Sequence, residues 1–187
     1  MQSNKQRQIF EVAANLISID GYKGTSLQKI ADKVGLHKST LFHYIRNKRD
    51  LLVYIFEQST SHVNTNLKMI CNSKESKPEE KLKAAVENHL NSIIEDISGL
   101  NIYLNELKIL PRKYRKVYMR KRKNYEILFK NIVNETKRKG YFKGLDSKIV
   151  TFAILGMLNS IPRWYKANGP LTIKEVSDIL FKMIIKK

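Results

Sequence analysis

The sequence predicts an all-α protein of about nine helices. Apolar residues recur three and four positions apart along almost the whole 187-residue chain, and no segment of useful length alternates with a period of two. Only four prolines and eight glycines occur, and most of them stand between the apolar runs, where helices end. Hydrophobic residues make up 42% of the chain, which is enough for a buried core despite a net charge of +18.

The first three helices are expected in quick succession. Ile9 lies in an apolar run that Asp20-Gly21 closes, because glycine suits a helix C-terminal cap. Ser26 stands where its hydroxyl can cap the amides of the next apolar run, and Gly35 ends that run. A short third helix is expected over residues 38–45.

Longer helices are expected in the rest of the chain. Asn47 can cap the first of them, and Pro78 and Pro111 each suit the first turn of a helix. Gly99 and Gly140 interrupt the helical pattern. The remaining helices are therefore expected at about 48–70, 78–97, 101–109, 111–140, 147–165 and 172–186.

Residues 25–51 have the spacing of a helix-turn-helix. Ala31 is small where two helices must approach closely, and Gly35 can take the positive φ that a tight interhelical turn requires. Leu36 anchors the turn, and Leu41 returns to the core ten residues after Ala31. Any helical hairpin shows part of this spacing, but the combination with a polar, basic exposed face favours DNA binding.

The second helix of this motif is expected to present its N-terminal half to base edges in the major groove of double-stranded DNA. Hydroxyls before the first helix and basic residues at the start of the long helix suit phosphate oxygens. The residues expected to contact DNA are Thr25, Ser26, Leu36, His37, Lys38, Ser39, Thr40, Phe42, His43, Tyr44 and Lys48.

Residues 5–52 resemble the N-terminal domain of the TetR family of bacterial transcriptional regulators. The resemblance rests on Ile9–Leu16, Gly21–Ser26, Ile30-Ala31, Val34-Gly35, Ser39–Tyr44 and Asn47–Leu52. Two positions depart from the common pattern: many members have glycine in place of Ser39 and phenylalanine in place of Ile45. The resemblance implies an N-terminal three-helix DNA-binding domain over residues 1–47 and a larger helical ligand-binding and dimerisation domain over residues 48–187.

The last two expected helices carry apolar faces with small residues that permit close packing. These faces comprise Ile149, Phe152, Ala153, Gly156 and Ser160 on one helix, and Val176, Ile179, Leu180, Met183 and Ile184 on the other. They can pack within the monomer or between two copies. The resemblance favours a homodimer through the last two helices, whose two-fold axis would predict a palindromic operator.

The segment 156–181 resembles a branch of this family that regulates fatty-acid and sterol breakdown and responds to acyl-CoA thioesters. The shared positions are Gly156, Asn159, Arg163, Trp164, Tyr165, Gly169, Pro170 and Leu171. The resemblance implies a repressor of lipid metabolism that an acyl-CoA effector releases from its operator. The expected ligand-binding residues are Leu104, Arg122, Tyr125, Phe129, Leu158, Asn159, Arg163 and Trp164. An alternative effector is another hydrophobic small molecule, such as a drug whose efflux the protein controls.

The positive charge is concentrated in one part of the chain. Residues 108–143 contain 14 basic and two acidic side chains, a net charge of +12, whereas residues 1–50 have a net charge of only +5. The basic stretch is either a solvated helix face or a site for the phosphates of coenzyme A. The total charge also suits a nonspecific DNA-binding protein, which is the less favoured interpretation.

Other function classes find little support in the sequence. There is no nucleophile elbow, no phosphate-binding glycine loop and no metal-ligand spacing around His62 or His89, so neither an enzyme nor a cofactor or metal is expected. Cys71 is the single cysteine, which suits a reducing compartment. Without an apolar leader or membrane span, the protein is expected in the cytoplasm with no membrane partner.

Overall fold

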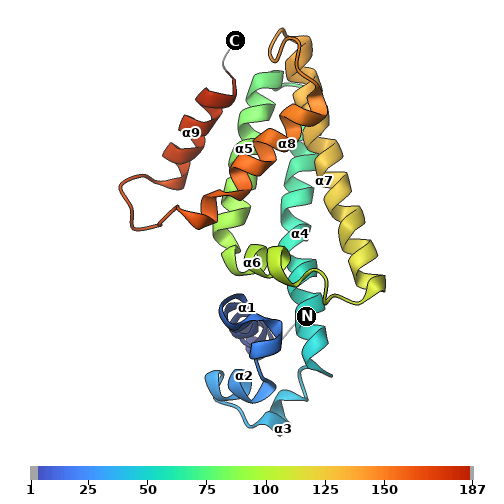
Figure 1. Ribbon diagram of the computed structural model, residues 1–187, viewed down its shortest axis with the longest axis vertical. Coiled ribbons are helices and arrows are strands. Elements are labelled where there is room, and N and C mark those ends of the chain that lie inside the picture. The colour runs from blue at the N-terminus through green and yellow to red at the C-terminus, as the bar shows by residue number, and fades with distance from the viewer. Residues whose placement is uncertain (1–3, 186–187) are drawn as a thin grey trace. The chain divides into compact units, whose positions relative to one another are not determined.

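The computed structural model describes residues 4–185, and for residues 59–62, 100, 103 and 104 it describes the backbone only (Figure 1). The described chain contains nine α-helices, one 3₁₀-helix and no strand, which confirms the predicted all-α class. The α-helices are α1 (Asn4–Gly24), α2 (Leu27–Lys33), α3 (Lys38–Leu41), α4 (Lys48–Asn72), α5 (Pro78–Glu95), α6 (Ile97–Glu106), α7 (Arg112–Arg138), α8 (Ser147–Asn159) and α9 (Ile173–Ile184). The 3₁₀-helix is Ile161–Arg163.

The chain divides into two compact units by packing. The first unit comprises the residues up to Thr60 together with Asp96–Met119, and the second comprises Ser61–Glu95 together with the residues from Arg120 onward. The packing boundary therefore falls inside α4 and again inside α7, because both helices contribute to both units. The functional boundary at residue 47 stays a prediction.

The first unit contains two apolar clusters that share α1. One cluster joins α1 to α2, α3 and the beginning of α4 through Ile9, Phe10, Ala13, Leu16, Ile30, Ala31, Val34, Leu41, Ile45 and Leu51. The other joins α1 to α4, α6 and the beginning of α7 through Ile17, Leu52, Ile55, Phe56, Ile102, Leu110 and Tyr118. Residues three, four and seven apart place both sets on α1 within one turn-repeat, so α1 holds the helix-turn-helix and α6 at once.

The second unit is a helix bundle around one apolar core. The end of α4 packs with α5, α7, α8 and α9, as the ribbon shows for the segments coloured teal to red (Figure 1). The buried members of this core include Leu67, Leu82, Val86, Leu90, Phe129, Ile132, Val133, Ile154, Leu158, Val176 and Leu180. Their spacing follows the helical repeat in each segment, as the sequence predicts.

Two helix boundaries differ from the prediction for local reasons. The carboxylate of Asp96 accepts the Gly99 N–H at 2.8 Å, so α6 begins at Ile97 and glycine lies in its first turn. The helix expected over 147–165 ends at Asn159, because Pro162 lacks an N–H and the chain continues as a 3₁₀ turn.

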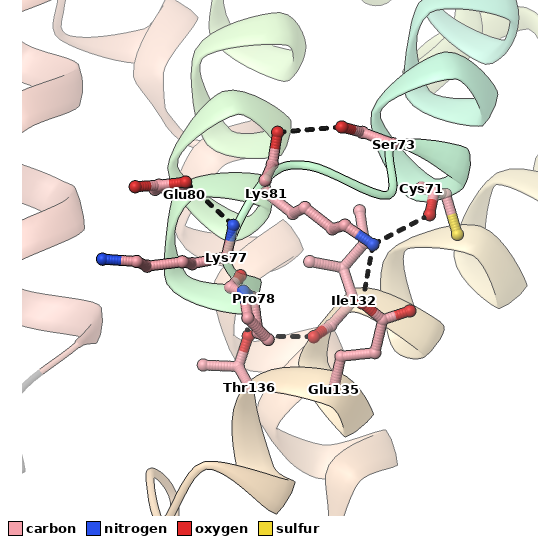
Figure 2. Close-up of polar contacts among 10 residues, drawn as sticks. Cys71, Ser73, Lys77, Pro78, Glu80, Lys81, Ile132, Glu135 and Thr136 are labelled. Atoms are coloured by element: carbon pink, nitrogen blue, oxygen red, sulfur yellow. Dashed lines mark hydrogen bonds and ion pairs between the residues drawn. The ribbon is translucent and has the colours of Figure 1, made fainter.

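A partly buried lysine connects three helices of the second unit (Figure 2). The Lys81 side chain extends from the first turns of α5, and its residue is only 8% exposed. Its Nζ donates to the Cys71 carbonyl near the end of α4 at 3.2 Å and lies 2.9 Å from a Glu135 carboxylate oxygen on α7. Beside it, the Thr136 hydroxyl lies 3.2 Å from the Pro78 carbonyl. A cation at the last carbonyls of a helix also suits the helix dipole.

Replacing this lysine is expected to destabilise the second unit. Lys81→Met should lower the free energy of unfolding by about 2 kcal/mol, because the Glu135 carboxylate and the Cys71 carbonyl lose a partly buried partner. Urea unfolding followed by circular dichroism measures the change. Lys83→Met is the matched control: Lys83 lies 2.7 Å from Asp178, but its side chain is 41% exposed, so less than about 1 kcal/mol should be lost. Equal losses in the two variants would contradict this interpretation.

Candidate functional site

The helix-turn-helix forms where the sequence predicts it. The Ser26 hydroxyl accepts a backbone N–H in the first turn of α2, and Gly35 has a φ of +68° in the turn. The Leu36 N–H then donates to the Ala31 carbonyl at 2.9 Å, which closes the turn. A side chain at Gly35 would be strained by this backbone conformation, although the space around it is open.

The second helix of the motif is shorter than expected. Regular α-helix ends at Leu41, and the chain continues to Tyr44 through hydrogen bonds between residues three apart, such as Tyr44 N–H to the Leu41 carbonyl at 3.0 Å. The exposed residues on this segment are His37, Lys38, Ser39, Phe42 and His43, whereas Leu36, Thr40 and Tyr44 are half-buried. Five of the predicted base-contacting side chains are therefore accessible together.

The predicted phosphate-contacting residues occupy different environments. Ser26 is exposed, and its hydroxyl proton stays available for a phosphate because its oxygen acts as the helix cap. Thr25 is buried, and its hydroxyl already donates to the Gly21 carbonyl at 3.0 Å, which disfavours a contact with a phosphate acceptor. Lys48 is half-buried, with its ammonium bonded to the Tyr22 carbonyl and 4.2 Å from the centre of the Tyr22 ring. Contacts of these residues with DNA stay predictions.

The second unit holds a buried polar centre made of residues from three helices. The His89 ring on α5 lies with Nδ1 2.8 Å from the Tyr125 hydroxyl of α7 and with Nε2 3.2 Å from the Asn159 side-chain oxygen at the end of α8. Because the Asn159 oxygen can only accept, Nε2 carries the proton and Nδ1 accepts from the tyrosine. The three groups therefore satisfy one another inside an apolar core.

Burial controls the charge of this polar centre. It lowers the pKa of His89 to about 4, although the bond to Asn159 opposes the shift, so the imidazole is neutral at pH 7. Burial also raises the pKa of Tyr125, which therefore keeps its proton. The centre is uncharged and offers hydroxyl, imidazole and amide groups to a neutral polar atom of a ligand.

His89 is the residue that the sequence interpretation passed over. A lone histidine has no recognisable partner in sequence, since Tyr125 lies 36 positions away and Asn159 lies 70 positions away. The available signal is its position on α5, seven residues after Leu82 and three after Val86, on the face that is buried.

The structure brings some of the predicted ligand-binding residues together and separates others. Tyr125, Phe129 and Leu158 belong to one buried cluster, and Asn159 joins it through His89. The exposed members of the predicted set are Arg122, Arg163 and Trp164. The side chain of Leu104 lies outside the described residues.

The predicted basic stretch forms much of the exposed surface of α7. Arg112, Lys113, Lys116, Arg120, Arg122, Lys123 and Lys130 are all exposed. One of them, Arg122, is paired with Glu126 on the same helix at 2.8 Å. This arrangement accommodates both interpretations of the stretch, the solvated face and the phosphate site.

Two searches of the described residues found no further kind of site. Among residues 4–185, leaving out the side chains named above, no group of three His, Cys, Asp or Glu side chains is arranged to hold a metal ion. Within the same residues, no helix is both long and apolar enough to span a membrane.

The buried histidine predicts a pH dependence of stability. The unfolded imidazole binds a proton near its usual pKa of 6.5, whereas the folded one binds it only near 4, so stability should fall as the pH drops through this window. The separation of the two pKa values corresponds to a loss of about 3 kcal/mol at full protonation. Urea unfolding between pH 7 and pH 4 should show this loss in the parent protein and not in His89→Gln.

The matched control for the pH experiment is His43→Gln, because the His43 ring is exposed in the folded protein. This variant should keep the pH dependence of the parent protein. A parent protein whose stability changes with pH in parallel with His89→Gln would show that His89 does not contribute.

Comparison with known proteins identifies the family of this chain. The family model described as bacterial regulatory proteins, tetR family, matches residues 9–55. The model described as tetracyclin repressor-like, C-terminal domain, matches residues 75–187. The two matches thus cover the helix-turn-helix and most of the helices that follow it.

Individual relatives match over nearly their whole length. The HTH-type transcriptional repressor KstR2 of Mycobacterium tuberculosis is 24% identical over 187 residues, which cover 98% of this chain and 93% of the relative. The fatty acid metabolism regulator protein of Bacillus subtilis is 22% identical over 183 residues, covering 97% and 94%. The solved structure of AibR in complex with isovaleryl coenzyme A and operator DNA has a TM-score of 0.83 and 27% identity, covering 97% of this chain and 98% of that one. Because one family model alone matches more than half of its residues, the chain belongs to the TetR family of bacterial regulatory proteins.

Proposed function

We propose that the protein is a homodimeric transcriptional repressor that leaves a palindromic operator when it binds an acyl-CoA thioester. The observation that carries the proposal is the buried centre of Tyr125, His89 and Asn159 in the second unit. Two of these three residues belong to segments that resemble acyl-CoA-responsive regulators. A family member with a comparable fold, AibR, has been solved with an acyl-CoA and operator DNA.

The exposed face of the helix-turn-helix supports specific DNA recognition. Lys38 and His43 carry hydrogen-bonding groups that can reach base edges, and Phe42 offers an apolar contact to a thymine methyl group. Ser26 and Lys48 supply the phosphate contacts that set the position of the motif on the duplex. Residues 1–47 are therefore proposed as the DNA-binding domain.

Exposed apolar residues on α8 and α9 support dimerisation. The residues are Ile149 (66% exposed) and Phe152 (42%) on α8, and Ile179 (46%) and Met183 (65%) on α9. Gly156 is exposed beside them and leaves room for a close approach by a partner helix. In contrast, Val176 and Leu180 are buried in the unit's own core. The predicted face of α9 therefore divides into an internal part and an exposed part that a second copy can cover.

The buried polar centre supports a thioester effector. The acyl-CoA carbonyl and the amides of its pantetheine arm need hydrogen-bond partners inside an apolar core, and the hydroxyl, imidazole and amide of the centre are such partners. Exposed Arg122, Arg163 and the neighbouring basic residues of α7 are available to phosphate groups. An effector that binds better to the state with low DNA affinity then lowers operator occupancy.

The first step of the test identifies the operator. Selection from a library of random DNA duplexes should recover an inverted repeat, because two recognition helices on a two-fold axis read two half-sites. Lys38→Ala should recover a different repeat, since a base contact is lost, whereas a nonspecific DNA-binding protein would recover no repeat with either chain.

The second step tests the effector on the recovered duplex. Isovaleryl-CoA and longer acyl-CoAs should release the protein in a mobility-shift titration, with free coenzyme A as the control that carries the phosphates without the acyl group. His89→Ala should require at least about tenfold more acyl-CoA, since a hydrogen-bond partner is lost from a buried site. Failure of every acyl-CoA, or release by an unrelated hydrophobic drug, would reject the thioester effector and leave the repressor standing.

A further inference from the structure

The corner between α1 and α2 in the first unit is bonded to a residue far away in sequence. Gly21 has a φ of +74°, which interrupts the helical backbone near the end of α1. The next residue, Tyr22, donates its N–H to a carboxylate oxygen of Glu106 at 2.8 Å. A side chain at Gly21 would place its Cβ 3.2 Å from that same oxygen. Glycine is therefore needed here both for the backbone conformation and for the approach of the carboxylate.

The same corner holds two residues that are expected to face DNA. The Gly21 carbonyl accepts the Thr25 N–H at 3.2 Å and the Thr25 hydroxyl at 3.0 Å. The Tyr22 carbonyl accepts the Lys48 ammonium, which also lies 4.2 Å from the centre of the Tyr22 ring. The peptide of Tyr22 is thus bound on its N–H side by Glu106 and on its carbonyl side by Lys48.

The two charges of the corner stand at unfavourable ends of their own helices. Lys48 is the first residue of α4, where the helix dipole disfavours a cation, and Glu106 is the last residue of α6, where it disfavours an anion. Burial lowers the pKa of Lys48, and the nearby Glu106 charge opposes that shift. Each charge is therefore retained against its local helix and is stabilised by the other.

We propose that Glu106 is a positioning residue for DNA binding, which acts through Tyr22 on Lys48. The carboxylate fixes the Tyr22 peptide, and the fixed carbonyl and ring hold the Lys48 ammonium in one orientation for a DNA phosphate. This inference rests on the proposed DNA-binding function. It extends the DNA-binding machinery to α6, which lies outside residues 1–47. It also predicts a sign: although Glu106 is negatively charged, removing it weakens binding to DNA.

The test compares charge with hydrogen bonding at Glu106. Dissociation constants for the selected duplex and for a scrambled duplex are measured by fluorescence anisotropy over a range of KCl concentrations. Glu106→Ala should weaken binding roughly fivefold to tenfold, and its plot of log affinity against log salt should become shallower by about 0.9, as expected for one lost phosphate contact. Glu106→Gln should stay within about twofold of the parent, because the amide oxygen still accepts the Tyr22 N–H.

A double-mutant cycle shows whether the effect passes through Lys48. Lys48→Met should reproduce the weaker binding and the shallower salt dependence, and adding Glu106→Ala to it should cause no further loss. Gly21→Ala, which displaces the carboxylate, should give the same salt dependence by an independent route. Glu75→Ala is the charge control: Glu75 is exposed in the second unit, and its loss should leave the salt dependence unchanged. Circular dichroism confirms that each variant is folded.

Several results would overturn this inference. Tighter binding of both Glu106 variants would make the carboxylate an electrostatic competitor of DNA, and additive losses in the cycle would separate it from Lys48. An unchanged salt dependence in Lys48→Met would remove the phosphate contact on which the inference depends. The scrambled duplex keeps this test separate from the proposed function, because a protein that selects no operator still binds phosphates.

Discussion

Buried polar groups need partners inside the protein, and in this chain the partners come from distant helices. Lys81 finds Glu135, His89 finds Tyr125 and Asn159, and the Tyr22 peptide finds Glu106. Apolar periodicity brings the helices together, but it allows some rotation and sliding. These polar pairings admit one register, because a shifted helix would leave a buried donor or acceptor without a partner.

The local features of the fold could be predicted from the sequence because their causes are local. Gly35 adopts the positive φ that its position implies, and Ser26 caps α2 as its place before an apolar run predicts. The helix 38–45 was harder to delimit, since its last residues form tighter turns that the same apolar spacing allows. Leu41 returns to the core in either case, so the motif is formed despite the different length.

The functional centres could not be predicted in full because they depend on contacts between remote segments. Tyr22 and Glu106 are 84 positions apart, and nothing in the pattern around either residue identifies the other. Family resemblance led to Tyr125 and Asn159, but the histidine that joins them carries no local signal beyond its place on a buried face. Trp164 was expected to line an apolar site, and its 55% exposure leaves that role to a ligand or partner.

The distribution of charge separates the two proposed binding functions. The net charge of +18 suggests a nucleic-acid partner, but the helix-turn-helix segment holds little of it, and much of the exposed surface of α7 is basic. The central claim is that two copies of this chain read one symmetric operator. Native mass spectrometry of the protein with the selected duplex tests it most directly: the account predicts an even number of 21.8 kDa chains on each duplex, with Phe152→Asp shifting the free protein to monomers. A single chain bound per duplex at saturating protein would contradict it.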